Sequence, residues 1–268
     1  MSIITISRGS YSRGRDVAER LAQKFGFECI SREVILEASD RFNVPEATLV
    51  RAIHDAPSVL DRYTYGKEKY VAYVRAALLK YVQKDNVVYH GFAGQFFLQE
   101  VPGVLKVRIT AGIEDRVGEV MRRDGVSMEA ARSIVEKDDE ERRKWSLHLY
   151  GMDTRSPDLY DLVLNIKNMT VDDAVELIAY NVRLPCFEIT ADARRVLDDL
   201  ALAAHVQAVL TDEFPTVNVT VKGGTAFVSI QAALSQQDKQ VNQARSIVRN
   251  IEGVKGVQVN CVPFVVPD

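Results

Sequence analysis

The stretch SRGSYSRGRD, residues 7–16, decides the fold of the first part of this 268-residue chain. It follows the apolar run IITI at residues 3–6 and precedes the helical pattern VAERLAQKF at residues 17–25. Gly9 and Gly14 have the spacing of the motif G-x-x-x-x-G-K-[ST], in which backbone N–H groups at a helix N-terminus point at an anion. The stretch therefore predicts a phosphate-binding loop between a strand and a helix.

Two positions of this loop depart from the motif. Arg15 stands in the lysine position, and Asp16 stands in the Ser/Thr position. Arginine keeps the positive charge and binds phosphate oxygens through a planar fork. Asp16 would repel a phosphate unless a divalent cation lies between them, which makes it a candidate Mg²⁺ ligand. The alternative is a simple strand-to-helix turn in which Asp16 only faces the helix dipole. The candidate nucleotide-binding residues are Gly9, Ser10, Ser12, Arg13, Gly14, Arg15 and Asp16.

Short apolar runs alternate with longer helical patterns over the first 180 residues. The helical period is clear at residues 17–25 and 67–83. Strands that alternate with helices form a parallel sheet with both faces covered, so we expect an α/β domain of the nucleotide-binding type. The expected strands are IITI at 3–6, FECI at 27–30, VVY at 87–89, VLKVRI at 104–109 and YDLVLN at 160–165.

The pattern changes after residue 180. The segment NVRLPCFEIT at 181–190 contains a proline and predicts a linker. Gly223-Gly224 lies between two β-branched runs and predicts a hairpin turn. The remaining expected elements are a helix near 190–213, strands at 216–221 and 225–231, a helix near 235–251 and a strand at 255–262. We therefore expect a first domain at residues 1–183 and a separate small α+β unit, of α-β-β-α-β order, at residues 188–268.

Composition excludes several classes of protein. The formal net charge of -3 argues against a nucleic-acid partner, and no apolar run approaches the ~20 residues that span a bilayer. The short apolar run at the N-terminus is not a secretory signal, so we expect a cytoplasmic protein. The three cysteines are widely spaced and contain no CxxC pair, which argues against a disulfide framework and a zinc site.

The phosphate loop and the segments after it resemble the cytidylate kinase-like family, which commonly carries a G-G-R type loop instead of the lysine form. The similarity is carried by SRGSYSRGRDVAERLAQKFGFECISREVI at 7–35, VVYHGFAGQFFL at 87–98, VRITAGIEDRVGEVMRRDGVSMEAA at 107–131, DDEERRKWSLHLYG at 138–151 and SPDLYDLVLN at 156–165. The resemblance implies a P-loop kinase core with a parallel five-stranded sheet and helices on both faces. It also implies ATP as the phosphoryl donor, Mg²⁺ as its metal, and a nucleoside monophosphate, CMP or dCMP, as the acceptor.

The resemblance places a cation-rich lid at residues 116–144. Asp139, Arg142 and Trp145 match the family's D-x-x-R-x-x-aromatic pattern, and helical spacing puts them on one face. We therefore expect Asp139 to orient Arg142 toward a phosphate while Trp145 anchors the face. An exposed helix with many ion pairs would also produce the run DDEERRK. The predicted catalytic residues are Arg15, Arg116 and Arg142.

The acceptor side departs from the family's pattern. Related kinases usually carry Gly-Arg after the third strand, whereas this chain has Gly91 followed by Phe92, which cannot bind a phosphate. His90 is a candidate for part of that role, although a histidine at a strand end is more often structural. Ser31-Arg32-Glu33 resembles the family's Asp-Arg-Glu, with serine in place of the acid. The predicted substrate-binding residues are Arg32, Glu33, His90, Gly91 and Asp139.

Residues 190–264 resemble a BON domain in element order and in the ending RSIVRNIEGVKGVQVN. That resemblance implies a lipid or protein partner. Three functions stay open: a magnesium-dependent nucleoside monophosphate kinase, a kinase fold that has lost turnover and senses nucleotides through its C-terminal unit, and an adaptor that binds no nucleotide.

Overall fold

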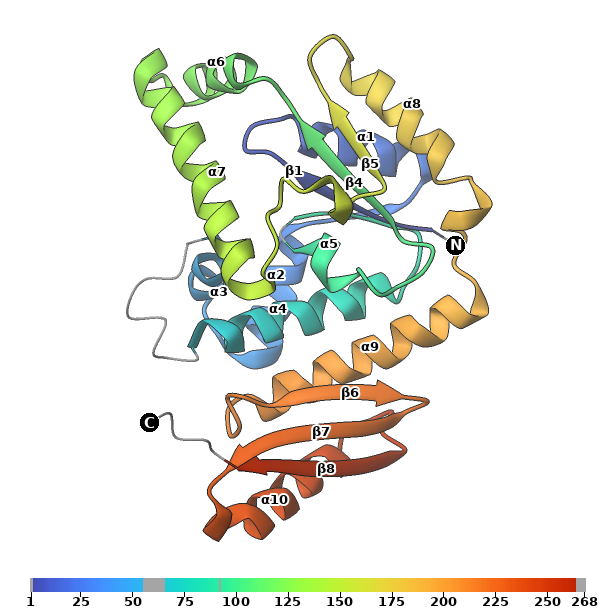
Figure 1. Ribbon diagram of the computed structural model, residues 1–268. Helices are drawn as coiled ribbons and strands as arrows, with labels where there is room; N and C mark the ends of the chain where they lie inside the picture. The colour runs from blue at the N-terminus through green and yellow to red at the C-terminus, as the bar shows by residue number, and fades with distance from the viewer. Residues whose placement is uncertain (1, 55–65, 92, 264–268) are drawn as a thin grey trace.

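A computed structural model describes residues 2–54, 66–91 and 93–263, which form two sheets with helices packed on them (Figure 1). The first sheet is parallel and five-stranded, with the order β2-β3-β1-β4-β5. Its strands are β1 (Ile3–Arg8), β2 (Glu28–Ile30), β3 (Val87–His90), β4 (Leu105–Thr110) and β5 (Leu162–Asn165). The predicted five-stranded parallel sheet, with a second small sheet at the C-terminus, is confirmed.

Helices cover both faces of the first sheet (Figure 1). They are α1 (Gly14–Phe25), α2 (Arg32–Phe42), α3 (Glu46–His54), α4 (Gly66–Val82), α5 (Gly94–Phe97), α6 (Ile113–Asp124), α7 (Met128–Tyr150) and α8 (Val171–Asn181). One core lies between the sheet and helices α1 and α8, and a second lies under α2, α4, α5 and the end of α7. No helix in the described part of the chain is long and apolar enough to cross a bilayer.

The alternation of β1 explains how one face of the sheet becomes polar at its carboxyl edge. Ile4 and Ile6 point into the core under α1 and α8. Thr5 and Ser7 point to the other face, because successive strand residues alternate. Parallel register places Tyr89 beside Thr5 and Arg108 beside Ser7. Polar side chains of β3, β1 and β4 therefore lie side by side near the carboxyl ends of these strands.

The second sheet has the order β6-β7-β8. Strands β6 and β7 are antiparallel, β7 and β8 are parallel, and one α-helix connects β7 to β8. Gly223 and Gly224 turn the antiparallel β6-β7 hairpin with φ values of 59° and 82°, which glycine adopts without steric cost. The unit consists of α9 (Ala191–Leu210), β6 (Asn218–Lys222), β7 (Thr225–Ala232), α10 (Gln237–Arg249) and β8 (Gly256–Pro263). Its predicted element order is therefore observed.

Helix α9 belongs to two cores at once, as its position between α4 and the small sheet indicates (Figure 1). Leu197 is fully buried in the core that contains α4, and Val206 is fully buried in the core of the small sheet. Across the same contact, the Tyr73 hydroxyl on α4 donates to Asp212 at 2.9 Å. The small sheet is thus attached through a helix that contributes buried residues to both cores.

Candidate active site

The loop between β1 and α1 is tied to the neighbouring strand β4. The Gly9 N–H donates to the Ile109 carbonyl at 3.0 Å, and the Ser12 hydroxyl lies 2.9 Å from the Gly9 carbonyl and 3.0 Å from the Ile109 carbonyl. Tyr11 and Arg13 have φ values of 59° and 60°, a left-handed conformation that costs a non-glycine residue roughly 1–2 kcal/mol. The Ser12 side chain, predicted as a nucleotide ligand, therefore holds the loop itself together.

The two glycines of the loop let arginines pack against it. A Cβ at Gly14 would lie 2.8 Å from Cβ of Arg8, and a Cβ at Gly9 would lie 3.2 Å from Nη1 of Arg116. The first distance is too short for two carbon atoms. Glycine is thus required at position 14 by the close approach of Arg8, whereas a side chain at position 9 would ask the end of Arg116 to shift by a few tenths of an ångström.

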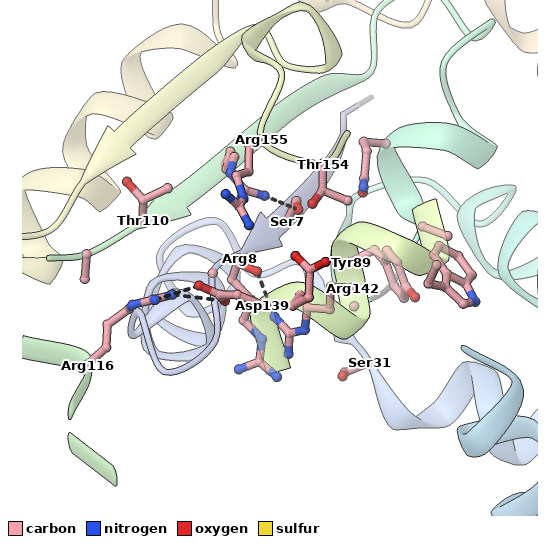
Figure 2. Close-up of a pocket in the computed structure, with 18 of the residues that line it drawn as sticks. Ser7, Arg8, Ser31, Tyr89, Thr110, Arg116, Asp139, Arg142, Thr154 and Arg155 are labelled. Atoms are coloured by element: carbon pink, nitrogen blue, oxygen red, sulfur yellow. Dashed lines mark hydrogen bonds and ion pairs between the residues drawn. The ribbon is translucent and has the colours of Figure 1, made fainter. Parts of the chain in front are cut away.

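A cavity of about 860 Å³ opens at this edge of the sheet (Figure 2). It is bounded by the loop, by the ends of β3 and β4, and by α7. Its arginines are Arg8, Arg108, Arg116, Arg142 and Arg155, and its acids are Glu46, Glu136, Asp139 and Glu140. The cavity brings together five predicted site residues: Gly9, Gly91, Arg116, Asp139 and Arg142.

Arg116 and Asp139 form a two-point ion pair beside the loop. Nη1 of Arg116 lies 3.1 Å from Oδ1 of Asp139, and Nη2 lies 2.7 Å from Oδ2. The Ser10 N–H also approaches Oδ1, at 3.4 Å. Burial alone would raise the pKa of the Asp139 carboxyl, but the hydrogen bonds and charge of Arg116 outweigh burial and lower it. Asp139 therefore orients Arg116, whereas the sequence pattern predicted that it would orient Arg142.

Arg142 donates a hydrogen bond to the backbone at the end of strand β1. Its Nη1 donates to the Arg8 carbonyl at 3.0 Å. Burial, and then the charge of Arg8, lower the pKa of Arg142 to about 10, and burial followed by the charge of Arg15 lowers the pKa of Arg8. Both groups stay protonated at neutral pH. Arg142, whose charge is disfavoured by burial and by the nearby guanidinium of Arg8, therefore stands at a place that an anion would stabilise.

The predicted residues at the start of α1 lie outside the cavity lining. The Arg15 side chain is 66% exposed and pairs with Glu19, with 2.7 Å between Nε and Oε1. Asp16 accepts from Nε of Arg13 at 3.3 Å. The carboxylates of Asp16 and Asp139 are thus each engaged by an arginine, and the described residues hold no group of three or more acidic, histidine or cysteine side chains that suits a metal ion. This donor set does not form a magnesium site by itself.

Only some of the residues predicted to bind the acceptor line the cavity. Gly91 lines it, whereas His90 is buried beside β1 and burial, followed by the charge of Arg8, lowers its pKa to about 4. The Glu33 carboxylate accepts from the Ser31 N–H at 2.7 Å, and it is Ser31 that reaches the cavity lining. Arg32 is the first residue of α2. Phe92 lies outside the described residues.

Sequence reasoning missed Arg108 and Arg155 as cavity residues, and it treated Arg8 only as a further positive charge on the loop. The signal for Arg108 was present, because a charged side chain in the middle of the apolar strand LKVRIT needs a polar surrounding. The signal for Arg8 was its place as the last residue of β1, next to the loop. Arg155 follows α7 in a turn, where the sequence carries no regular period.

Comparison with known proteins finds similarity to kinases over the first part of the chain. The model of the cytidylate kinase-like family matches residues 3–168. The cytidylate kinase of Thermococcus sibiricus is 38% identical over 80 residues, which cover 30% of this chain and only 40% of that enzyme. The cytidylate kinase of Ignicoccus hospitalis is 26% identical over 179 residues, which cover 66% of this chain and 97% of that enzyme. A crystallised, uncharacterised protein from Eubacterium ventriosum shares the fold, with a TM-score of 0.53, 19% identity, and coverage of 69% of this chain and 99% of that one.

Proposed function

This chain belongs to the cytidylate kinase-like family, and on that premise we propose that it transfers a phosphoryl group from a nucleoside triphosphate, ATP, to a nucleoside monophosphate, CMP or dCMP. The observation that carries the proposal is the group of arginines at the loop between β1 and α1, of which Arg116 is buried and Arg8 and Arg142 are half-buried. Arg8, Arg116 and Arg142 line one cavity at the carboxyl edge of a parallel sheet, which is where open α/β folds bind their ligands.

For phosphoryl transfer, the protein mainly has to place positive charges around the reacting phosphate. In phosphoryl transfer, negative charge spreads over the oxygens of the moving group, and catalysis consists mainly of placing cations around them. A phosphomonoester carries an ionised oxygen at neutral pH, because its second pKa is about 6, so the acceptor needs no general base. We assign Arg116, fixed by Asp139, and Arg142, fixed by the Arg8 carbonyl, to the transferring group. Arg8 joins them as a ligand of the donor phosphates.

Magnesium is part of the proposal as the counter-ion of the triphosphate, and when bound it would neutralise phosphate charge. Asp16 is the predicted protein ligand, but its carboxylate accepts from Arg13 in this arrangement. Asp16 would have to break its contact with Arg13 to bind the metal. Arg15 would likewise have to break its ion pair with Glu19 to bind the triphosphate, as the sequence predicts.

The test combines binding with turnover in the full chain. Mg²⁺-ATP is titrated calorimetrically into wild type, Arg116→Met, Arg15→Ala and the control Arg20→Met, whose guanidinium pairs with Asp172 outside the cavity. Loss of a charged hydrogen bond weakens binding by about 10- to 100-fold, so we expect that loss in Arg116→Met and none in the control. A coupled assay with CMP, dCMP, UMP and AMP then identifies the acceptor. Absence of transfer to all four would overturn the proposal.

A second candidate is a nucleotide sensor that has lost turnover. Tyr11 and Arg13 hold a strained loop, and α9 joins the kinase core directly to the small sheet. Such a helix would carry a change at the first domain to a lipid or protein partner of the C-terminal unit, whose BON-like character remains a prediction. ATP binding without transfer to any acceptor would favour this candidate.

A further inference from the structure

We propose that Arg108 and Arg155 bind the anionic group of the acceptor, so that β4 and the turn after α7 supply the charge that is missing after β3. This inference rests on the proposed function. It addresses the point at which the sequence departs from its family, where Gly91 is followed by phenylalanine instead of arginine.

The first support is the position of Arg108 on the floor of the cavity. It stands on the central strand β4, beside Ser7 of β1 in the parallel register, and it lines the cavity. Its Nη1 donates to the Ser7 hydroxyl at 3.4 Å and to the Tyr160 hydroxyl at 3.3 Å, and its guanidinium lies 5.5 Å from the Tyr160 ring centre. These long bonds are made by one nitrogen of a group with five N–H donors.

The second support is the charge balance around the two arginines. Both recorded partners of the Arg108 guanidinium are neutral hydroxyl oxygens. Within the described residues, no acid forms an ion pair with Arg108 or Arg155, whereas Asp139 is paired with Arg116 and Glu140 with Arg143. The pKa of the Glu140 carboxyl is lowered mainly by its hydrogen bond from Arg143, and the charge of Arg155 contributes least. Two guanidinium groups that line one cavity and form no ion pair within the described residues form a site suited to a phosphate.

The third support is that one tyrosine links Arg108 to the turn that carries Arg155. The Tyr160 hydroxyl has one proton, and it donates that proton to the Thr154 carbonyl at 2.9 Å, because a carbonyl can only accept. The same oxygen accepts from Arg108. Tyr160 therefore ties the floor of the cavity to the turn that carries Arg155. Figure 2 shows Ser7, Thr154 and Arg155 on one side of the cavity, above Arg8, Asp139 and Arg142 as drawn.

The arrangement divides the cavity into two anion subsites. Arg8, Arg116 and Arg142 lie around the loop and bind the phosphates of the triphosphate, while Arg108 and Arg155 bind the phosphate of the acceptor. The acceptor class that follows is a phosphomonoester, and an uncharged nucleoside would leave Arg108 without its ligand. Tyr160 is a positioning residue in this scheme.

The experiment separates the two subsites by titrating the full chain with CMP, dCMP, UMP, AMP and uncharged cytidine, and separately with Mg²⁺-ATP. Compared variants are Arg108→Met, Arg108→Lys, Arg155→Met, Tyr160→Phe and the control Arg20→Met. For the monophosphate that wild type binds best, we expect Kd to rise about 10- to 100-fold in Arg108→Met and Arg155→Met, with partial rescue in Arg108→Lys. Cytidine binding and ATP binding should stay within about twofold of wild type.

Tyr160→Phe distinguishes positioning from simple structural support. We expect the KM for the acceptor to rise several-fold in this variant while the Kd for ATP and the unfolding midpoint change little, since the phenyl ring still packs. An unchanged monophosphate Kd in Arg108→Met, or no monophosphate binding by wild type, would overturn the inference. If wild type binds a monophosphate through Arg108 but transfers no phosphate to it, the proposed transfer fails and the acceptor site stands.

Discussion

Arg116 on α6 and Asp139 on α7 are joined by two parallel hydrogen bonds, of 3.1 and 2.7 Å, directly beside the phosphate loop. The pair fixes the direction of the guanidinium of Arg116, a residue that is only 8% exposed. It also joins the two helices of the predicted lid to each other, and the Ser10 N–H joins the loop to the same carboxylate. One carboxylate thus organises three segments that are far apart in the sequence.

Asp139→Asn should lower stability in a pH-dependent way. The pKa of Asp139 is lowered in the folded protein, so its ionised form contributes stability above its ordinary pKa of 3.8, and that contribution is lost as pH falls through the lower folded value. We expect a loss of about 1–3 kcal/mol in the free energy of unfolding at pH 7, because Arg116 keeps its buried charge and loses its partner. Urea denaturation at pH 7 and near pH 3 checks this. A difference between variant and wild type that is equal at both pH values would contradict it.

Gly14→Ala should distort the loop, whereas Gly118→Ala should not. A Cβ at Gly14 meets Cβ of Arg8 at 2.8 Å, while a Cβ at Gly118, within α6, meets nothing within 4 Å. We expect Gly14→Ala to lower stability by about 1–3 kcal/mol and to weaken ATP binding at least tenfold. Gly118→Ala should stabilise the protein by about 0.5–1 kcal/mol, since alanine is the better helix former. Equal effects of the two substitutions in thermal unfolding would show that the Arg8 contact is unimportant.

The strands were predictable because each buried strand of a parallel sheet is a short apolar run, as IITI and VLKVRI are. The loop between β1 and α1 was predictable from its glycine spacing, and its binding of phosphate stays a prediction. The partner of Asp139 was not, because helical spacing relates residues within α7 and Arg116 lies on α6. The role of α9 was also hidden: its alanine and leucine positions cover more than one side of the helix, and a helix that is apolar on two sides gives no single face to assign.

Tyr11 connects the loop between β1 and α1 to helices α6 and α7 while its own backbone is strained. Its hydroxyl donates to Asp138 at 2.8 Å, its ring lies 4.6 Å from the Arg123 guanidinium, and its φ is 59°. Tyr11→Phe keeps the strain and loses the hydrogen bond, so we expect a loss of about 0.5–1.5 kcal/mol. Tyr11→Gly removes both strain and fastening, which should leave stability within about 1 kcal/mol of wild type.

The two Tyr11 variants are separated by local motion. Hydrogen exchange of the backbone amides in the loop and in α7 should be faster in Tyr11→Gly than in Tyr11→Phe, since only glycine removes the ring that Arg123 covers. Identical exchange in the two variants would mean that the ring does not restrain the lid.

Leu197→Ala should destabilise the core of the first domain, although Leu197 lies on the first helix of the C-terminal unit. Its side chain is fully buried in the core that also contains residues of α4 and Trp145. Truncation of a buried leucine costs about 2–5 kcal/mol, whereas the neighbouring Val196, which is 39% exposed, should tolerate alanine within about 0.5 kcal/mol. Trp145 is the single tryptophan of the chain and lies in this shared core, so its fluorescence reports on the unfolding of that core. We therefore expect the urea midpoint measured by Trp145 fluorescence to fall in Leu197→Ala and to stay unchanged in Val196→Ala. If the Trp145 midpoint is the same in both variants, α9 stabilises only the small sheet and does not couple the two cores.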